Sequence, residues 1–512
     1  MRLWVRYDTT QSRKSAKLSG RTAITRRGAF GLLAGLAAYP ALGAAGERLG
    51  PAQAFSWELL VGRAKALAGK PYATPRVSQR QAQDFDAAGR LTFGEAGRLA
   101  GLVRLLPAPR NSPNIVGIHI VERGKARSLA SPDGMFAGGG VADPAGFRVL
   151  AANLQTDWLA YQGASYFRSS GSRDQYGLSA RGIAVDTGLS GPEEFPLFTD
   201  FWIERITDTH FIVHALLDGP SLAGVFAFDN RLGPDGVTQD VKSALFMRKD
   251  IRRLGIAPAT SMFWYDEGQR RQAVDWRPEI HDSDGLAIWS ATGERIWRPL
   301  GNPEGLRTSS FRADGVKGFG LMQRDQSFDN YQDDGARYDR RPSLWIEPAG
   351  DWGPGAVQLF EIPTDSETMD NIVAFWVGDR AVKAGERRDF GYRLRWTSAD
   401  LSDGGTARAV NTWIGAGGIP GAPPVAGARK YVIDFRGPAL AGLTRGSKVE
   451  AVVNLKAPAL AGLSAYPVVG QQDLWRVVVD VLPGKTGARE LRLYLRRGAA
   501  ALSETVIEPL SP

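Results

Sequence analysis

The chain has 512 residues, more than one compact core of ordinary size holds, so two domains are expected. It contains no cysteine, which excludes disulfides, thiolate metal sites and cysteine nucleophiles. The formal net charge of +9 is concentrated in residues 1–45, which carry eight basic residues and one acidic residue. The other 55 basic and 53 acidic residues nearly balance, so the body of the chain has no general electrostatic reason to bind nucleic acid.

The basic N-terminal segment has the pattern of an export signal. Arg26 and Arg27 stand directly before an uncharged run over residues 28–46, and small residues at 43–45 offer a cleavage site. The run is rich in glycine and alanine and contains a proline, so an uncleaved membrane anchor is the weaker alternative. We predict a twin-arginine signal peptide over residues 1–45, read by the twin-arginine translocase, and a mature protein in the periplasm without stable membrane insertion.

Beyond this leader, one short helix precedes a long series of strands. Apolar residues recur at helical spacing over residues 55–69, where glycine and proline end the pattern. Residues 201–205 and 211–217 are mostly apolar, as in strands covered on both faces, whereas residues 392–396 alternate as in a half-exposed strand. Turn signals separate these runs, which predicts a large antiparallel β sandwich over residues 46–400.

The composition changes near residue 400. Residues 415–424 are rich in glycine and proline, as in a linker or a long loop. Four strand-like runs follow, at residues 430–435, 448–453, 475–481 and 490–495. Short strands at this spacing predict a small immunoglobulin-like sandwich over residues 401–512.

Two acidic segments lie in a region rich in aromatic residues. They cover residues 277–286 and 361–371, and eight of the 14 tryptophans fall between residues 260 and 400. Paired carboxylates can act as acid and base in glycoside hydrolysis, and aromatic rings stack on sugar faces. Acidic loops are also commonly solvated turns and tryptophans are commonly core residues, so the residue types alone leave both interpretations open.

Other familiar chemistries lack their motifs in this chain. It has no P-loop, no dinucleotide fingerprint and no His-Glu-x-x-His. Residues 177–182 miss the nucleophile-elbow spacing by one residue, and residues 329–335 depart from a calcium loop at two positions. The four histidines are scattered, so neither a metal nor a cofactor is expected.

An ordered series of short motifs runs from residue 163 to residue 376. They are residues 163–168 (GASYFR), 176–182 (YGLSARG), 193–196 (EEFP), 254–258 (LGIAP), 260–263 (TSMF), 277–286 (RPEIHDSDGL), 296–300 (IWRPL), 318–321 (GFGL), 323–325 (QRD), 340–343 (RRPS) and 361–376 (EIPTDSETMDNIVAFW). This series resembles the osmoregulated periplasmic glucan biosynthesis protein G/D family, and the twin-arginine leader is more similar to protein D.

The resemblance implies a mainly β fold, with a large galactose-mutarotase-like antiparallel β sandwich followed by an immunoglobulin-like β sandwich. It implies a periplasmic protein that acts on β-1,2-linked glucan, since some family members are inverting endo-β-1,2-glucanases. The family's general base corresponds to Asp282 and its general acid to Asp370, with protonation relayed rather than direct. Tyr338 matches a tyrosine associated with the site.

Four further residues in or beside these motifs are candidates for substrate binding, namely Trp297, Trp345, Glu367 and Arg324. The predicted function is control of the β-1,2-glucan backbone by inverting endo-hydrolysis, as a glycoside hydrolase. One alternative is a non-catalytic glucan-binding protein that organises the backbone during synthesis, and a weaker one is a sugar epimerase, because fold does not fix function. The segment over residues 72–147 is more diverged than the family's usual start, and a homodimer is left open.

Overall fold

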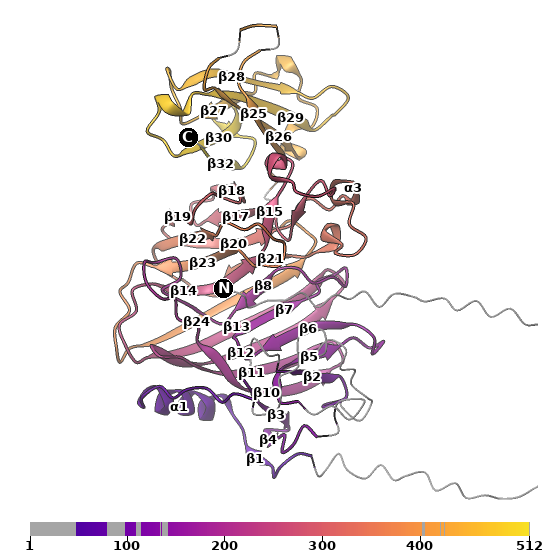
Figure 1. The fold of residues 1–512 in the computed structure, drawn as a ribbon, viewed down its shortest axis with the longest axis vertical. Helices are drawn as coiled ribbons and strands as arrows, with labels where there is room; N and C mark the ends of the chain where they lie inside the picture. Colours follow the sequence, from indigo (N-terminus) through magenta and orange to yellow (C-terminus); the bar gives the residue numbers. More distant parts are fainter. Residues whose placement is uncertain are drawn as a thin grey trace, which may run out of the picture.

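The computed structural model describes residues 48–78, 98–108, 114–133, 135, 142–401, 405–419, 421–423 and 425–510 (Figure 1). The predicted signal peptide lies outside the described residues. The predicted helix is confirmed as α1 (Trp57–Ala68), whose first turn is capped by Ser56 Oγ, which accepts from the backbone N–H of Leu59 at 3.3 Å. Leu60 and Ala64 of α1 pack against the outer face of the largest sheet. Among the described residues, no helix is long and apolar enough to cross a bilayer.

The largest sheet has 16 strands within the described part of the chain. In spatial order they are β1 (Gln53–Ala54), β4 (Lys125–Ser128), β3 (Gly117–Glu122), β10 (Leu197–Thr207), β11 (His210–Asp218), β12 (Leu222–Gly233), β13 (Gly236–Met247), β24 (Arg387–Thr397), β21 (Ser343–Pro348), β20 (Val316–Met322), β17 (Gly285–Ser290), β18 (Arg295–Pro299), β32 (Thr505–Pro509), β30 (Glu490–Arg497) and β27 (Glu450–Val453), with β31 (Ala500–Ala501) beside β30. The two apolar runs predicted as covered strands are β10 and β11, and the alternating run lies in β24.

A second sheet faces the first across the main core. Ten strands of it are described: β19 (Arg307–Ala313), β22 (Gly355–Glu361), β23 (Ile372–Gly378), β14 (Leu254–Ser261), β8 (Ser179–Arg181), β7 (Tyr166–Ser169), β6 (Asp157–Gln162), β5 (Pro144–Leu150) and β2 (Val103–Pro107), with β9 (Ala184–Val185) beside β14. Aromatic side chains from both sheets meet between them, such as Tyr161 and Phe228 with ring centroids 5.2 Å apart. The mainly β fold class is therefore confirmed.

The C-terminal strands form a smaller sandwich, drawn at the top of Figure 1. One of its layers is a four-stranded sheet of β25 (Arg408–Ala416), β26 (Arg429–Arg436), β29 (Leu474–Val481) and β28 (Leu460–Pro467). The other layer is the β32–β30–β27 end of the largest sheet, because β32 pairs in parallel with β18. The largest sheet therefore runs through both sandwiches. The division into two domains at residue 400 stays a prediction.

A short two-stranded ribbon, β15 (Phe263–Tyr265) and β16 (Ile280–His281), stands apart from both large sheets. Beyond it lie the short helices α3 (Phe328–Tyr331) and η4 (Tyr338–Arg340). Four of the seven candidate site residues lie in or directly beside the ribbon, η4 and the loop between β22 and β23, namely Asp282, Tyr338, Glu367 and Asp370.

Candidate active site

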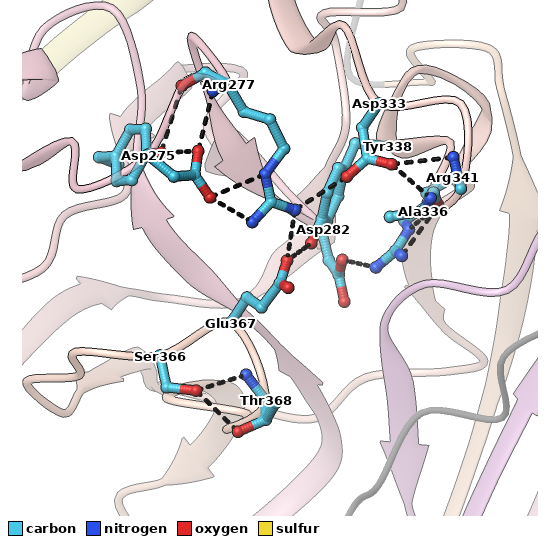
Figure 2. Close-up of polar contacts among 12 residues, drawn as sticks. Asp275, Arg277, Asp282, Asp333, Ala336, Tyr338, Arg341, Ser366, Glu367 and Thr368 are labelled. Carbon is cyan, nitrogen blue, oxygen red and sulfur yellow. Dashed lines mark hydrogen bonds and ion pairs between the residues drawn. The ribbon is translucent and has the colours of Figure 1, made fainter.

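Asp282 directly follows the ribbon strand β16 and is 4% exposed. Its backbone N–H donates to the carbonyl oxygen of Met262 at 2.8 Å, which ties it to the start of β15. Its carboxylate forms an ion pair with the guanidinium of Arg341, which follows η4 (Figure 2). The same guanidinium lies over the ring of Tyr338, 4.1 Å from the ring centroid. A buried carboxylate of this kind requires a counter-ion, and Arg341 supplies it.

Asp370 lies at the end of the loop between β22 and β23 and is half-buried. Burial raises the pKa of Tyr166, and the charge of Asp370 adds to the increase, so the two side chains are within electrostatic reach. The next residue, Asn371, is fully buried and binds both backbone polar groups of Phe263. The segment of Asp282 is therefore hydrogen-bonded to Met262, and the segment of Asp370 is hydrogen-bonded, through Asn371, to the next residue, Phe263.

Tyr338 and Glu367 meet beside Asp282. The phenol of Tyr338 donates to Glu367 Oε2 at 2.5 Å, and Arg277 donates to the same oxygen at 2.9 Å. Arg277 also binds Asp333 at 2.8 Å and Asp275 at 2.6 Å. Figure 2 shows Arg277 between these three carboxylates, with Asp282 and Arg341 on the far side of Tyr338. The structure thus brings together three of the residues named from sequence, Asp282, Tyr338 and Glu367.

The charges of this network reinforce one another. Burial alone would lower the pKa of Arg277, but hydrogen bonds to Asp275, Asp333 and Glu367 outweigh it and raise that pKa. Hydrogen bonding to Arg277 in turn lowers the pKa of Asp275. The hydrogen bonds of Arg277 therefore favour its charged form and position Glu367 against Tyr338.

A second charged cluster lies behind Asp282. His281 Nε2 is 3.1 Å from Glu279 Oε2, and its Nδ1 is 3.4 Å from Asp284 Oδ1 and 3.2 Å from Gln323 Oε1. Burial opposes a charged imidazole, but the hydrogen bond to Glu279 and the charges of Asp284 and Glu279 outweigh it and raise the pKa of His281 to about 10. Burial raises the pKa of Asp284 to about 7. A positively charged His281 thus supports the segment on which Asp282 lies.

Most aromatic rings near Asp282 are buried. Trp264, Tyr265, Tyr331 and Tyr338 pack with Met262 and Ile280 in one cluster. By contrast, Trp276 is 69% exposed and stands between the two network residues at positions 275 and 277. An exposed indole offers a face on which a sugar ring can stack.

A hollow of about 540 Å³ lies along the loop that leads to Asp370. Its lining combines amide and carboxylate groups with proline and methionine side chains: Gln272, Asn302, Pro303, Glu304, Pro363, Thr364, Asp365 and Met369. A larger hollow of about 870 Å³ is lined by Ala100, Gly101 and residues of β3, β10 and the turn into β11, and none of these is a site residue indicated by the sequence. Within the described residues, no group of three or more His, Asp or Glu side chains is arranged to hold a metal ion.

The structure places Trp297 and Trp345 in the core that joins the two sandwiches. They are 4% and 2% exposed and pack with residues of the C-terminal sheets. Their rings lie close over Gly285 and Gly318, where an added Cβ would come within 2.2 Å and 2.4 Å of ring atoms, so no larger residue fits. Neither indole presents a free face in this structure, and their role in substrate binding stays a prediction.

Arg324 lies at the same junction. Its side chain is 5% exposed, binds Asp400 and Glu504, and covers the Trp297 ring at 3.6 Å. The guanidinium therefore connects the two sandwiches, and its contact with substrate also stays a prediction. The structure does not group Arg324, Trp297 and Trp345 with Tyr338 and Glu367.

Arg277, Arg341 and Asn371 lie inside the motifs given above, but the sequence predicts no role for any of them. A general rule could have indicated the arginines, because a carboxylate placed in an aromatic-rich segment needs a nearby cation if it is buried. The local sequence gives no such signal for Asn371, whose partner Phe263 is 108 residues away.

Comparisons with known proteins agree with this arrangement of motifs. The family model described as periplasmic glucan biosynthesis protein, MdoG, matches residues 55–509. Glucans biosynthesis protein D 2 of Ralstonia nicotianae is 40% identical over 510 residues, covering 92% of this chain and 94% of that protein. Glucans biosynthesis protein D of Stenotrophomonas maltophilia strain K279a is 41% identical over 493 residues, covering 91% of each.

Among solved structures, the galactose mutarotase related enzyme from Lactobacillus acidophilus is similar to this chain with a TM-score of 0.23 and 10% identity. The match covers 50% of this chain and 92% of that one. This similarity is too low to add to the fold assignment, which rests on the strands themselves.

Proposed function

The chain belongs to the family of periplasmic glucan biosynthesis protein, MdoG, and we propose that it controls the β-1,2-linked glucose backbone of periplasmic glucans by inverting endo-hydrolysis. The observation that carries this proposal is that Asp282 and Asp370 lie on segments attached to the adjacent residues Met262 and Phe263. Two carboxylates held on one support are what acid–base hydrolysis of a glycosidic bond requires.

In this proposal Asp282 is the general base that activates water, and Asp370 is the source of the proton for the leaving oxygen. An inverting pair needs a separation of roughly 6.5–9.5 Å, which leaves room for the water. In this proposal Tyr338 and Glu367, joined at 2.5 Å beside Asp282, bind the sugar chain. The hollow along the loop that leads to Asp370 supplies polar groups for the sugar chain, and the exposed Trp276 supplies a ring face.

One observation favours the non-catalytic alternative. Asp282 already forms a buried ion pair with Arg341, and this guanidinium competes with any water that the carboxylate would activate. A protein with this pairing retained could bind and organise a glucan without cleaving it.

The decisive experiment incubates the mature protein with linear β-1,2-glucan. Shorter chains, separated by size and carrying new reducing ends of α configuration by NMR, support inverting hydrolysis. Glucan binding detected by calorimetry without any shortening supports the organising role instead. An absence of both binding and cleavage would contradict the proposed function.

A further inference from the structure

The segment at residues 261–263 forms hydrogen bonds with Asp282, the proposed general base, and with the residue that follows it. Ser261 Oγ is 2.8 Å from Ser283 Oγ, and both serines are fully buried. The carbonyl oxygen of Met262 accepts from the N–H of Asp282 at 2.8 Å. These two contacts fix the residues at positions 282 and 283 relative to the end of β14.

Asn371 binds the same segment from the other side. Its Oδ1 accepts from the N–H of Phe263 at 2.8 Å, and its Nδ2 donates to the carbonyl oxygen of Phe263 at 2.9 Å. Strand β14 pairs with β23 as far as Ser261 and Ile372, and beyond that point the chain leaves the sheet. The amide of Asn371 thus takes the place of a neighbouring strand for Phe263, whose buried polar groups would otherwise be unsatisfied at a cost of about 1–3 kcal/mol each.

The same amide closes the loop that carries Asp370. Asn371 Nδ2 also donates to the carbonyl oxygen of Ile362 at 2.9 Å, and the N–H of Ile362 donates to the carbonyl oxygen of Asn371 at 2.9 Å. Both ends of the loop are therefore joined at one buried side chain. Asp370, the neighbour of Asn371 in the chain, takes its position from that joint.

We infer that Asn371 is a positioning residue that sets the separation between the carboxyl groups of Asp282 and Asp370 through residues 261–263. The inference rests on the proposed function for its kinetic consequence. In Asn371→Asp the shape and the acceptor remain, but a carboxylate oxygen replaces the donor that faces the carbonyls of Phe263 and Ile362. The resulting repulsion moves the loop, and a displacement of about 1 Å between catalytic groups can lower a rate by about a hundredfold.

The chain offers a matched control in Asn230. This asparagine is also fully buried, and its Nδ2 also donates to two backbone carbonyls, those of Phe211 and Phe228, at 3.0 Å each. It lies in the main core with Tyr161 and Gln239, and contacts no residue of the candidate site. Asn230→Asp therefore introduces the same chemical defect at the same burial without touching the loop.

The test measures glucan cleavage and melting temperature for the full mature protein and both variants, well below each melting temperature. For Asn371→Asp we expect kcat to fall by about tenfold to a hundredfold while KM changes by less than about threefold. Asn230→Asp should lose melting temperature with kcat unchanged. Equal kcat in the two variants, or a loss of kcat that follows only the unfolded fraction, would overturn the inference. If Asn371→Asp does not fold, Asn371→Ala and Asn230→Ala carry the same comparison.

A crystal structure of the Asn371 variant separates this inference from the proposed function. If wild-type protein binds glucan without cleaving it, the proposed hydrolysis fails, yet the separation of the Asp282 and Asp370 carboxyl groups can still be compared between wild type and variant. A changed separation supports the positioning role of Asn371, and an unchanged separation refutes it.

Discussion

The guanidinium of Arg324 lies 2.6 Å from Glu504 Oε1 and joins the loop after β20 to the residue that precedes β32. Both side chains are 5% exposed or less, and Asp400 binds the same guanidinium at 2.7 Å. The backbone N–H of Asp325, the residue after Arg324, donates to Asp284 Oδ2 at 2.9 Å. The ion pair of Arg324 and Glu504 is therefore next to the segment that carries Asp282. The two sandwiches are therefore held together by a buried charge cluster as well as by apolar packing.

This cluster predicts a large stability effect at Arg324. Replacing Arg324 with Ala leaves Asp400 and Glu504 buried without their cation, which should lower the free energy of unfolding by about 3–5 kcal/mol. The pair of Arg312 and Asp379 is the control, since its side chains are 70% and 37% exposed and Arg312→Ala should cost at most about 1 kcal/mol. Urea unfolding followed by tryptophan fluorescence measures both, and equal costs would contradict a structural role for the buried cluster.

Asp282→Asn and Asp370→Asn should each lower glucan cleavage by at least about a hundredfold, the usual contribution of general acid–base catalysis. Asparagine keeps the shape of each side chain but neither takes up nor releases a proton at neutral pH. Binding of β-1,2-glucan, measured by calorimetry, should be retained in both. Wild-type rates of chain shortening in these two variants would rule out the assigned roles.

Tyr338→Phe should reduce cleavage by about tenfold or more, because it removes the hydroxyl that holds Glu367 beside Asp282. Tyr161→Phe is the matched control. Tyr161 is equally buried, and its hydroxyl donates to Asn230 Oδ1 at 2.8 Å in the main core, away from the candidate site. The initial rate of reducing-end release distinguishes the two variants, and similar losses in both would argue against a specific role of Tyr338 in the site.

The raised pKa of His281 predicts that stability falls in alkaline solution. An unfolded histidine titrates near pH 6.5, whereas folded His281 titrates at about 10, so its charge stabilises the folded state fully below about pH 6.5 and this stabilisation is lost as the pH rises towards 10. Between pH 7 and 9.5 the free energy of unfolding should decline by up to about 1.4 kcal/mol per pH unit from this group. The pKa of Asp284 is raised from 3.8 to about 7, so this group also lowers the free energy of unfolding as the pH rises. Its contribution falls mainly below pH 7.

The variant His281→Gln tests this origin of the pH dependence. Glutamine can still donate to Glu279 but carries no titrating proton, so its unfolding free energy should change less steeply between pH 7 and 9.5. Denaturant titrations at several pH values supply the slopes. An identical slope in wild type and variant would show that other groups cause the decline.

Replacing Arg26 and Arg27 with lysines should retain the precursor in the cytoplasm, because the twin-arginine translocase reads the arginine pair. Cell fractionation with an antibody to the mature protein measures the distribution. Normal accumulation in the periplasm would mean that another route exports the protein.

Local sequence patterns were sufficient to predict the features that depend on neighbouring residues. The helical spacing over residues 55–69 predicted α1, and alternating or continuous apolar runs predicted β10, β11 and β24, since each pattern reflects which faces of a local element are covered. The acidic motifs place Asp282 beside His281, and Glu367 in the loop that leads to Asp370. These residue types left sugar chemistry as one of two open interpretations, and the resemblance of the motif series to a known family favoured it.

Which of these residues come into contact depends on the path of the whole chain. The counter-ion of Asp282 is 59 residues away in Arg341, and the partner of Arg324 is 180 residues away in Glu504. Trp297 and Trp345, named from the sequence as candidates for substrate binding, are core residues in this structure because β32 returns from the end of the chain to pair with β18 and bring the C-terminal sandwich over them. Local propensity carries no information on such pairings, since burial and ion pairing are set by the path of the whole chain and by the need to give every buried charge a partner.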